Sequence, residues 1–175
     1  APKDEKVKTE LSDMGCKFVS VKLDRRSLNV LNDFIYFFVI IKIIKNIKPD
    51  LVLSYTIKPV LYASLASYLC RVKKIFSIIT GVGFVFYNKS PLQKMLSFFM
   101  SRFLKISLSI NTTIFFQNDD DKKTFKDMGI ISSNNNVKII NGSGVDIKYY
   151  DYCKQVTNPV RFLIIARLLK EKGIY

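Results

Sequence analysis

Residues 51–84, LVLSYTIKPVLYASLASYLCRVKKIFSIITGVGF, decide the fold. Leu51–Leu53 predicts a short buried strand, Pro59–Cys70 predicts a helix rich in Ala, Leu and Ser, and Lys74–Ile79 predicts a second buried strand. Short apolar runs without strict alternation are typical of parallel strands that are buried on both faces. The stretch therefore predicts a strand–helix–strand unit of an α/β protein.

The same alternation continues on both sides of this unit. The other expected elements are helices over residues 3–14, Asn29–Ile47, Pro91–Ser109 and Asp119–Met128, and strands over Lys17–Leu23, Thr112–Phe116, Val137–Ile140 and Arg161–Ala166. Alternating elements favour a Rossmann-like, doubly wound parallel sheet. Such a domain normally opens with a strand, and the first element here is a helix, so we expect the chain to be a piece of a longer protein.

The composition narrows the class of protein. The chain has 175 residues, 49% of them hydrophobic and 24% charged, which suits one globular domain or one domain with part of another and argues against overall disorder. The formal net charge is +14. A surface of this charge favours a polyanionic partner or an anionic membrane.

Histidine and cysteine usage excludes several kinds of enzyme. The sequence has no histidine, which removes Ser-His-Asp and Cys-His triads and most zinc enzymes. Its three cysteines, Cys16, Cys70 and Cys153, are far apart and form no Cys-x-x-Cys pair, as expected of a reduced, cytosolic compartment. The charged first residues do not resemble a signal peptide, and no apolar run approaches the ~20 residues of a membrane span.

Two segments that follow predicted strands could bind a ligand. Thr80–Gly83 contains Gly81 and Gly83, which allow the backbone to approach a ligand closely. Tyr55–Pro59 opens a helix, and Lys58 adds a cation to a helix N-terminus that favours anions. Ligands of open α/β sheets bind beyond the carboxyl ends of strands, so both segments would line one cleft. The alternatives are a plain turn and a solvated lysine beside a helix-start proline.

Two charged stretches have competing interpretations. Asp119–Asp121 could hold a divalent metal, but Asn118 as a helix cap with acids in the first turn explains the same residues better. Near the end of the chain, Arg167 and Lys172 flank a predicted strand tip and helix start, which together could bind a diphosphate. The alternative is a pair of ordinary surface cations.

The helix over residues 92–105 has a wider apolar arc than one buried face needs. It mixes aromatic and basic side chains, as an interfacial helix on an anionic membrane would. The alternative is a helix sandwiched in the core. The residues expected to dock the membrane are Lys94, Phe99, Arg102, Phe103 and Lys105, with help from Lys42, Lys45 and Lys48.

The order of these motifs resembles family 4 glycosyltransferases of the GT-B fold. The motifs are IKPDLV at 47–52, YTIKP at 55–59, ITGVGF at 79–84, FQNDD at 116–120, GSGVD at 142–146 and ARLLKEKG at 166–173. Within that family the chain is similar to bacterial enzymes that build undecaprenyl-diphosphate-linked saccharides for capsule, O-antigen or protein glycans. The similarity extends over nearly the whole chain.

The resemblance implies two Rossmann-like domains that face each other across a cleft. Residues 1–145 would be an incomplete acceptor-side domain, residues 146–159 a linker, and residues 160–175 the first strand of the donor-side domain. Gly142, Gly144 and Asp146 would lead into the hinge.

The resemblance also implies an activity. Such enzymes transfer a sugar, here expected to be a hexose or N-acetylhexosamine, from a UDP-sugar to a lipid-diphosphate-linked saccharide with retention at the anomeric carbon. They need no metal or other cofactor. The expected location is cytoplasmic, at the inner face of the cytoplasmic membrane, with no nucleic-acid partner.

Individual residues receive roles from the same resemblance. Arg167 and Lys172 match the two cations that hold the donor diphosphate. Thr80, Gly81 and Gly83 would lie beside the transferred sugar as the catalytic loop, and the acceptor or sugar cleft would contain Lys58, Tyr55 and Thr56.

Two departures from the family pattern matter. Many members carry a histidine where this chain has Thr80, and the acidic Glu-x7-Glu motif of the donor domain would lie beyond Tyr175. We therefore expect the 175-residue piece alone to have no transferase activity. The alternative functions are a basic α/β module that binds nucleic acid and a GT-B sugar epimerase.

Overall fold

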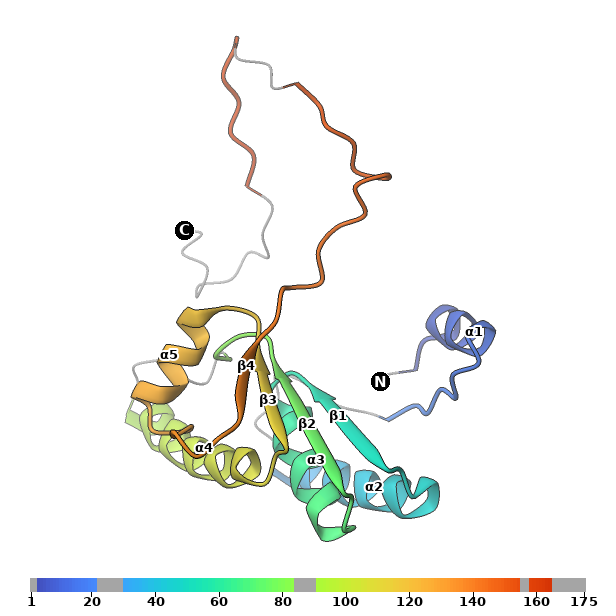
Figure 1. Ribbon diagram of the computed structural model, residues 1–175, viewed down its shortest axis with the longest axis vertical. Helices are drawn as coiled ribbons and strands as arrows, with labels where there is room; N and C mark the ends of the chain where they lie inside the picture. The colour runs from blue at the N-terminus through green and yellow to red at the C-terminus, as the bar shows by residue number, and fades with distance from the viewer. Residues whose placement is uncertain (1–2, 22–29, 84–90, 155–157, 165–175) are drawn as a thin grey trace.

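The computed structural model describes residues 3–21, 30–83, 91–154 and 158–164 of the chain (Figure 1). In these residues the helices are α1 (Glu5–Asp13), α2 (Val30–Ile47), α3 (Ile57–Leu69), α4 (Pro91–Ser109) and α5 (Asp119–Asp127). The strands are β1 (Leu51–Tyr55), β2 (Lys74–Ile79), β3 (Thr113–Phe116) and β4 (Val137–Ile139).

The four strands form one parallel sheet in the order β1-β2-β3-β4. In the register, Ser54 lies beside Ser77, and Ile78 lies beside Phe115. The predicted parallel α/β fold of the Rossmann-like class is thus confirmed. Because all strands point the same way, the loops that leave β1 and β2 meet at one edge of the sheet.

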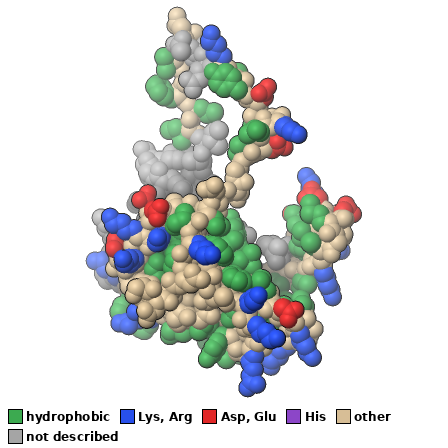
Figure 2. Space-filling view, viewed as in Figure 1, with side chains coloured by type: hydrophobic (Ala, Val, Ile, Leu, Met, Phe, Trp, Pro, Cys, Tyr) green, Lys and Arg blue, Asp and Glu red, His purple; other side chains and the backbone are tan. Residues whose placement is uncertain are grey.

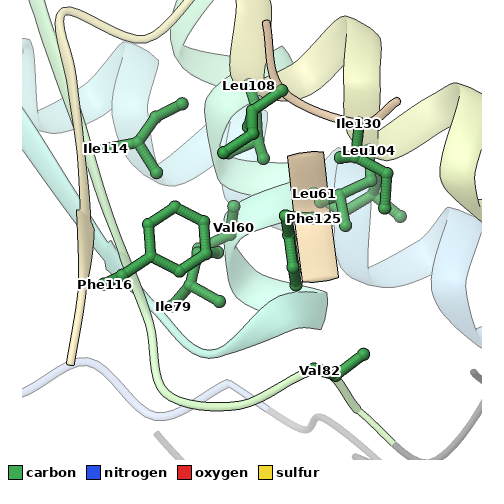
Figure 3. Packing of buried hydrophobic residues seen from close by; sticks show 11 residues of the cluster. Val60, Leu61, Ile79, Val82, Leu104, Leu108, Ile114, Phe116, Phe125 and Ile130 are labelled. Atoms are coloured by element: carbon green, nitrogen blue, oxygen red, sulfur yellow. The ribbon is translucent and has the colours of Figure 1, made fainter. Parts of the chain in front are cut away.

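The helices α2, α3 and α4 form a layer on one side of the sheet (Figure 1). Helix α3 packs against β1 and β2, and α2 and α4 pack on either side of α3. Between this layer and the sheet lies a core cluster, shown in Figure 3. Its members are apolar side chains from the sheet, the helices and the connecting loops: Val60, Leu61, Ile79, Val82, Leu104, Leu108, Ile114, Phe116, Phe125, Ile130 and Ile131.

The opposite side of β1 is more open than the sequence predicted. Leu51, Leu53 and Tyr55 are about half exposed, whereas Ser54 between them is buried. Side chains alternate between the two faces of a strand, so Ser54 points into the helical layer and its neighbours point away from it. Among the described residues only one face of β1 is covered, which corrects the prediction that Leu51–Leu53 is buried on both faces.

Local signals in the sequence explain where the helices begin and end. Asp4 caps α1 by accepting a hydrogen bond from the Val7 backbone N–H at 3.1 Å, and Gly15, with φ +74°, follows its end. Helix α3 begins at Ile57, two residues before the predicted start at Pro59, because proline is tolerated within the first turn of a helix.

Two predicted strands are wrong in the described part of the chain. Residues 17–21 of the stretch Lys17–Leu23 form no strand, and residues 161–164 of Arg161–Ala166 are exposed and form no strand either. The alternation of side chains gives a strand only where a neighbouring strand accepts the backbone hydrogen bonds. The remaining residues of both stretches lie outside the described residues.

Candidate functional site

The two glycine- and lysine-containing loops lie together at the carboxyl edge of the sheet. The backbone N–H of Thr56 donates to the carbonyl of Ile78 at 3.1 Å, which extends the pairing of β1 and β2 beyond β1. A Cβ added to Gly83 would stand 3.5 Å from Cγ1 of Ile57, so the loop after β2 touches the first turn of α3. The prediction that both loops lie at one edge is confirmed.

The backbone of these loops is held in uncommon conformations. Thr56 has φ +72°, Gly81 +153° and Gly83 +82°. A β-branched residue at positive φ carries a strain of roughly 1–3 kcal/mol, and such residues cluster at ligand sites. Val82, between the glycines, is buried and belongs to the core cluster (Figure 3). The core therefore anchors the loop through Val82, and the flanking glycines provide the turn.

A partly buried charge cluster joins the first turns of α2 and α3. Lys58 Nζ donates to Asp33 Oδ1 at 2.8 Å, and the Tyr62 hydroxyl donates to Asp33 Oδ2 at 3.0 Å. The side chains of Lys58 and Asp33 are only 11% and 17% exposed. Lys58 is therefore not the solvated lysine of the alternative interpretation. Asp33 instead fixes its ammonium beside the loop that follows β1.

Electrostatics keep Tyr62 protonated in this cluster. Burial raises its pKa well above the usual value, and the charge of Asp33 and the hydrogen bond to Asp33 raise the pKa further. Tyr36 of α2 packs edge-on against the Tyr62 ring at 5.8 Å between centroids, and burial raises the pKa of Tyr36 as well. Tyr62 thus acts as a hydrogen-bond donor that shares Asp33 with Lys58.

Sequence reasoning missed Asp33 and Tyr62. Asp33 lies 25 positions before Lys58 and 29 before Tyr62, on a helix whose apolar and basic side chains dominate the sequence pattern. One signal was present: Lys58 and Tyr62 are four residues apart on α3, so they share a helix face.

The other predicted site residues divide into three groups. Tyr55, at the end of β1, is about half exposed, and Thr80, after β2, is partly buried, so both belong to the same edge as Lys58. Gly142, Gly144 and Asp146 lie in the exposed segment after β4, where Asp146 Oδ1 accepts the backbone N–H of Lys148 at 2.9 Å. The predicted diphosphate cations, Arg167 and Lys172, lie outside the described residues.

The acidic run at 119–121 begins α5. Asn118 Oδ1 accepts the backbone N–H of Asp121 at 2.7 Å, which confirms the predicted helix cap. Lys122 pairs with Asp119 at 3.8 Å. Within the described ranges, no three His, Cys, Asp or Glu side chains are grouped closely enough to hold a metal ion.

The aromatic and basic helix predicted to dock a membrane has both a core face and an exposed face. Leu104 and Leu108 are fully buried, which fits the core alternative for that face. On the other side, all five predicted docking residues are exposed: Lys94, Phe99, Arg102, Phe103 and Lys105. Within the part of the chain that the structure describes, no helix is both long and apolar enough to cross a membrane.

Comparison with known proteins places these features in context. A family model described as glycosyl transferase 4-like matches residues 1–118, a range that contains α2, both loops and the Asp33–Lys58–Tyr62 cluster. The chain is also 23% identical, over 186 aligned residues, to N,N'-diacetylbacillosaminyl-diphospho-undecaprenol alpha-1,3-N-acetylgalactosaminyltransferase of Campylobacter jejuni subsp. jejuni serotype O:2. That alignment covers 99% of this chain and 49% of the relative, so the chain spans about half of the relative's length.

Proposed function

Because the chain belongs to the glycosyl transferase 4-like family, we propose that the protein transfers a sugar from a nucleotide donor to a lipid-diphosphate-linked saccharide. The observation that carries this proposal is the match to residues 1–118, which include both loops at the carboxyl edge of the sheet. The relative's acceptor, a saccharide on diphospho-undecaprenol, supports the lipid-diphosphate acceptor.

The carboxyl edge has the chemistry that an acceptor saccharide would need. Gly81 and Gly83 expose backbone at the end of β2, where a sugar can approach without meeting a Cβ. Asp33, which also accepts a hydrogen bond from Tyr62, holds the ammonium of Lys58 in one position. A fixed cation recognises a phosphate group at a smaller entropic cost than a mobile one. We assign Lys58 to the acceptor's diphosphate and Thr80–Gly83 to the sugar that is transferred.

The finer parts of the proposal concern the donor. We propose a UDP-linked hexose or N-acetylhexosamine as donor and retention at the anomeric carbon. Arg167 and Lys172 would neutralise the donor diphosphate without a metal. The 175-residue chain would then bind acceptor without turnover, and the activity would need the donor-side residues of a longer protein. Segment 142–146 would connect the two sides, and the product would enter a cell-surface polysaccharide or glycan.

A binding experiment tests the acceptor side. The 175-residue chain is titrated by calorimetry with farnesyl-diphosphate-linked N-acetylglucosamine, a soluble mimic of the acceptor. We expect saturable binding that Asp33→Asn/Lys58→Met weakens about ten-fold or more, as expected for the loss of a charge-assisted contact. This double variant removes the two charges of the Asp33–Lys58 pair together.

One control variant and one activity measurement complete the test. Lys123→Met removes an exposed cation from α5 and should leave the affinity unchanged. The transfer step is then measured with the complete reading frame, UDP-[¹⁴C]N-acetylhexosamine and the lipid-linked acceptor. No binding by the chain and no transfer of label to the lipid phase would refute the proposed function, and turnover by the 175 residues alone would refute the proposed division between two domains.

A further inference from the structure

Helix α4 is apolar on two opposite sides. Its inner side enters the core through Leu104 and Leu108. Its outer side carries a stripe of side chains that are each more than half exposed: Met95, Phe98, Phe99, Phe103 and Ile106. Arg102 lies within this stripe, with its guanidinium 5.2 Å from the centre of the Phe98 ring. A helix that only covers a sheet needs no second apolar side.

Helix α2 repeats the pattern, although its exposed apolar side was not predicted from the sequence. Tyr36 and Ile44 are buried, and the opposite side exposes Leu31, Phe34, Ile35 and Phe38 by more than half each. These four residues follow the i, i+3, i+4, i+7 spacing that places side chains on one face of a helix. The predicted contribution of this segment was limited to its lysines.

The charged side chains of both helices are mostly basic. Helix α4 contains Lys94, Arg102 and Lys105 and no acidic residue, and all three cations are exposed. Helix α2 ends in the exposed Lys42 and Lys45. Its one acid, Asp33, is neutralised by Lys58. Figure 2 shows several basic side chains at the lower right of the molecule, with one acidic group among them, where α2 lies in the same view.

Both stripes lie close to the candidate site. Helices α2 and α4 flank α3 on the same side of the sheet (Figure 1), and their outer sides face away from the core. Asp33, in the first turn of α2, contacts Lys58 at the carboxyl edge. Helix α4 runs from the carboxyl end of β2 to the amino end of β3, so its first turns are nearest that edge.

We propose that the outer sides of α2 and α4 form one docking surface for an anionic phospholipid bilayer, with the aromatic and aliphatic side chains in the interface and the cations on the headgroups. The combination of exposed apolar stripes and unopposed cations is what an interfacial helix needs. The docking surface itself is argued from the exposed side chains alone. Its purpose rests on the proposed function, because a lipid-linked acceptor would enter the site directly from the bilayer.

The charges favour a bilayer over other occupants. In a symmetric dimer through this surface, the cations of both copies would face one another across a desolvated interface, which is unfavourable. A nucleic acid would meet a surface whose centre is aliphatic and aromatic and offers few hydrogen-bond donors for phosphates. A bilayer satisfies both parts of the surface at once.

The test measures partitioning of the 175-residue chain onto vesicles that contain no acceptor and no nucleotide. We expect flotation with phosphatidylglycerol–phosphatidylcholine vesicles, and little with phosphatidylcholine alone or in high salt. Phe34→Ser/Phe38→Ser on α2 and Phe99→Ser/Phe103→Ser on α4 should each lower partitioning about ten-fold or more. Lys42→Glu/Lys45→Glu should lower it by more than roughly 25-fold, since each lost cation near an anionic surface contributes about a factor of five and each introduced carboxylate adds repulsion.

Matched controls lie on other parts of the molecule. Partitioning should not change in Leu53→Ser, because Leu53 is similarly exposed but lies on the opposite face of the sheet. It should also not change in Lys123→Glu/Lys126→Glu, because both lysines lie on α5. Equal losses in test and control variants, or flotation that no helix variant alters, would refute the proposal. A dimer in light scattering that Phe34→Ser/Phe38→Ser dissociates, or binding to RNA without binding to vesicles, would also refute it. A failure of acceptor binding with normal flotation would instead count against the proposed function alone.

Discussion

Replacing Asp33 by asparagine tests whether the charge cluster between α2 and α3 stabilises the fold. The change removes the carboxylate that pairs with Lys58 at 2.8 Å, in a site where the two side chains are 11% and 17% exposed. Removing one partner of a fully buried pair costs ~3–5 kcal/mol, and the residual exposure of both groups lowers the cost here to about 2 kcal/mol. Tyr62 keeps an acceptor, because the side-chain carbonyl of the introduced asparagine can take its hydrogen bond.

Thermal unfolding followed by circular dichroism measures the effect. A loss of about 2 kcal/mol should lower the Tm by roughly 4–8 °C in a chain of this length. Asp33→Asn/Lys58→Met removes both charges, so its cost should be smaller than the sum of the single variants by about 1–2 kcal/mol. Asp119→Asn, which breaks an exposed pair at 3.8 Å, should cost less than about 1 kcal/mol. Strictly additive single costs would show that the contact contributes nothing and would refute the reasoning.

Further predictions concern the core, the glycine loop and pH. Phe125→Ala should cost about 3–5 kcal/mol in urea unfolding, because its ring is fully buried 5.1 Å from that of Phe116, and a cost under ~1 kcal/mol would contradict the packing. Gly83→Ala should cost roughly 1–2 kcal/mol because of its φ of +82°, whereas Gly142→Ala, in open space, should be neutral; equal effects would refute a role for the backbone. Burial and Asp33 raise the pKa of Tyr62 above its unfolded value of about 10, so its contribution to stability is present below that pH and lost as the pH rises toward the folded pKa. Tyr62→Phe should therefore flatten the alkaline loss of stability, and an unchanged profile would assign that loss to other groups.

Much of the fold follows from the sequence because the elements have clear boundaries. The predicted and observed limits of Lys74–Ile79 and Pro91–Ser109 coincide. Gly81 follows closely after the end of the first element, and Pro91 begins the second. The carboxyl-edge placement of Lys58 and Thr80 could also be predicted, because it depends only on the direction of parallel strands.

What could not be predicted depends on contacts between distant residues. Lys17–Leu23 has the alternation of a strand, but alternation does not supply a neighbouring strand. The partnership of Asp33 with Lys58 depends on the angle at which α2 crosses α3. Phe34 and Phe38 look like core residues in the sequence, and only the packing of Tyr36 and Ile44 against α3 shows that they belong to the outer side.

The order of the strands in the sheet has a consequence for biosynthesis. Strands β1, β2, β3 and β4 lie side by side in the order in which the ribosome makes them. Among the four strands that the structure describes, each strand that leaves the exit tunnel thus finds its neighbour already in place, and none of the four has to be inserted between two others. Domains fold from their N-terminal side during synthesis, and short-range pairing makes such folding fast. The β1–α3–β2 unit can therefore form while the residues of α4 are still being translated, and it can serve as the template on which the rest of the sheet is built.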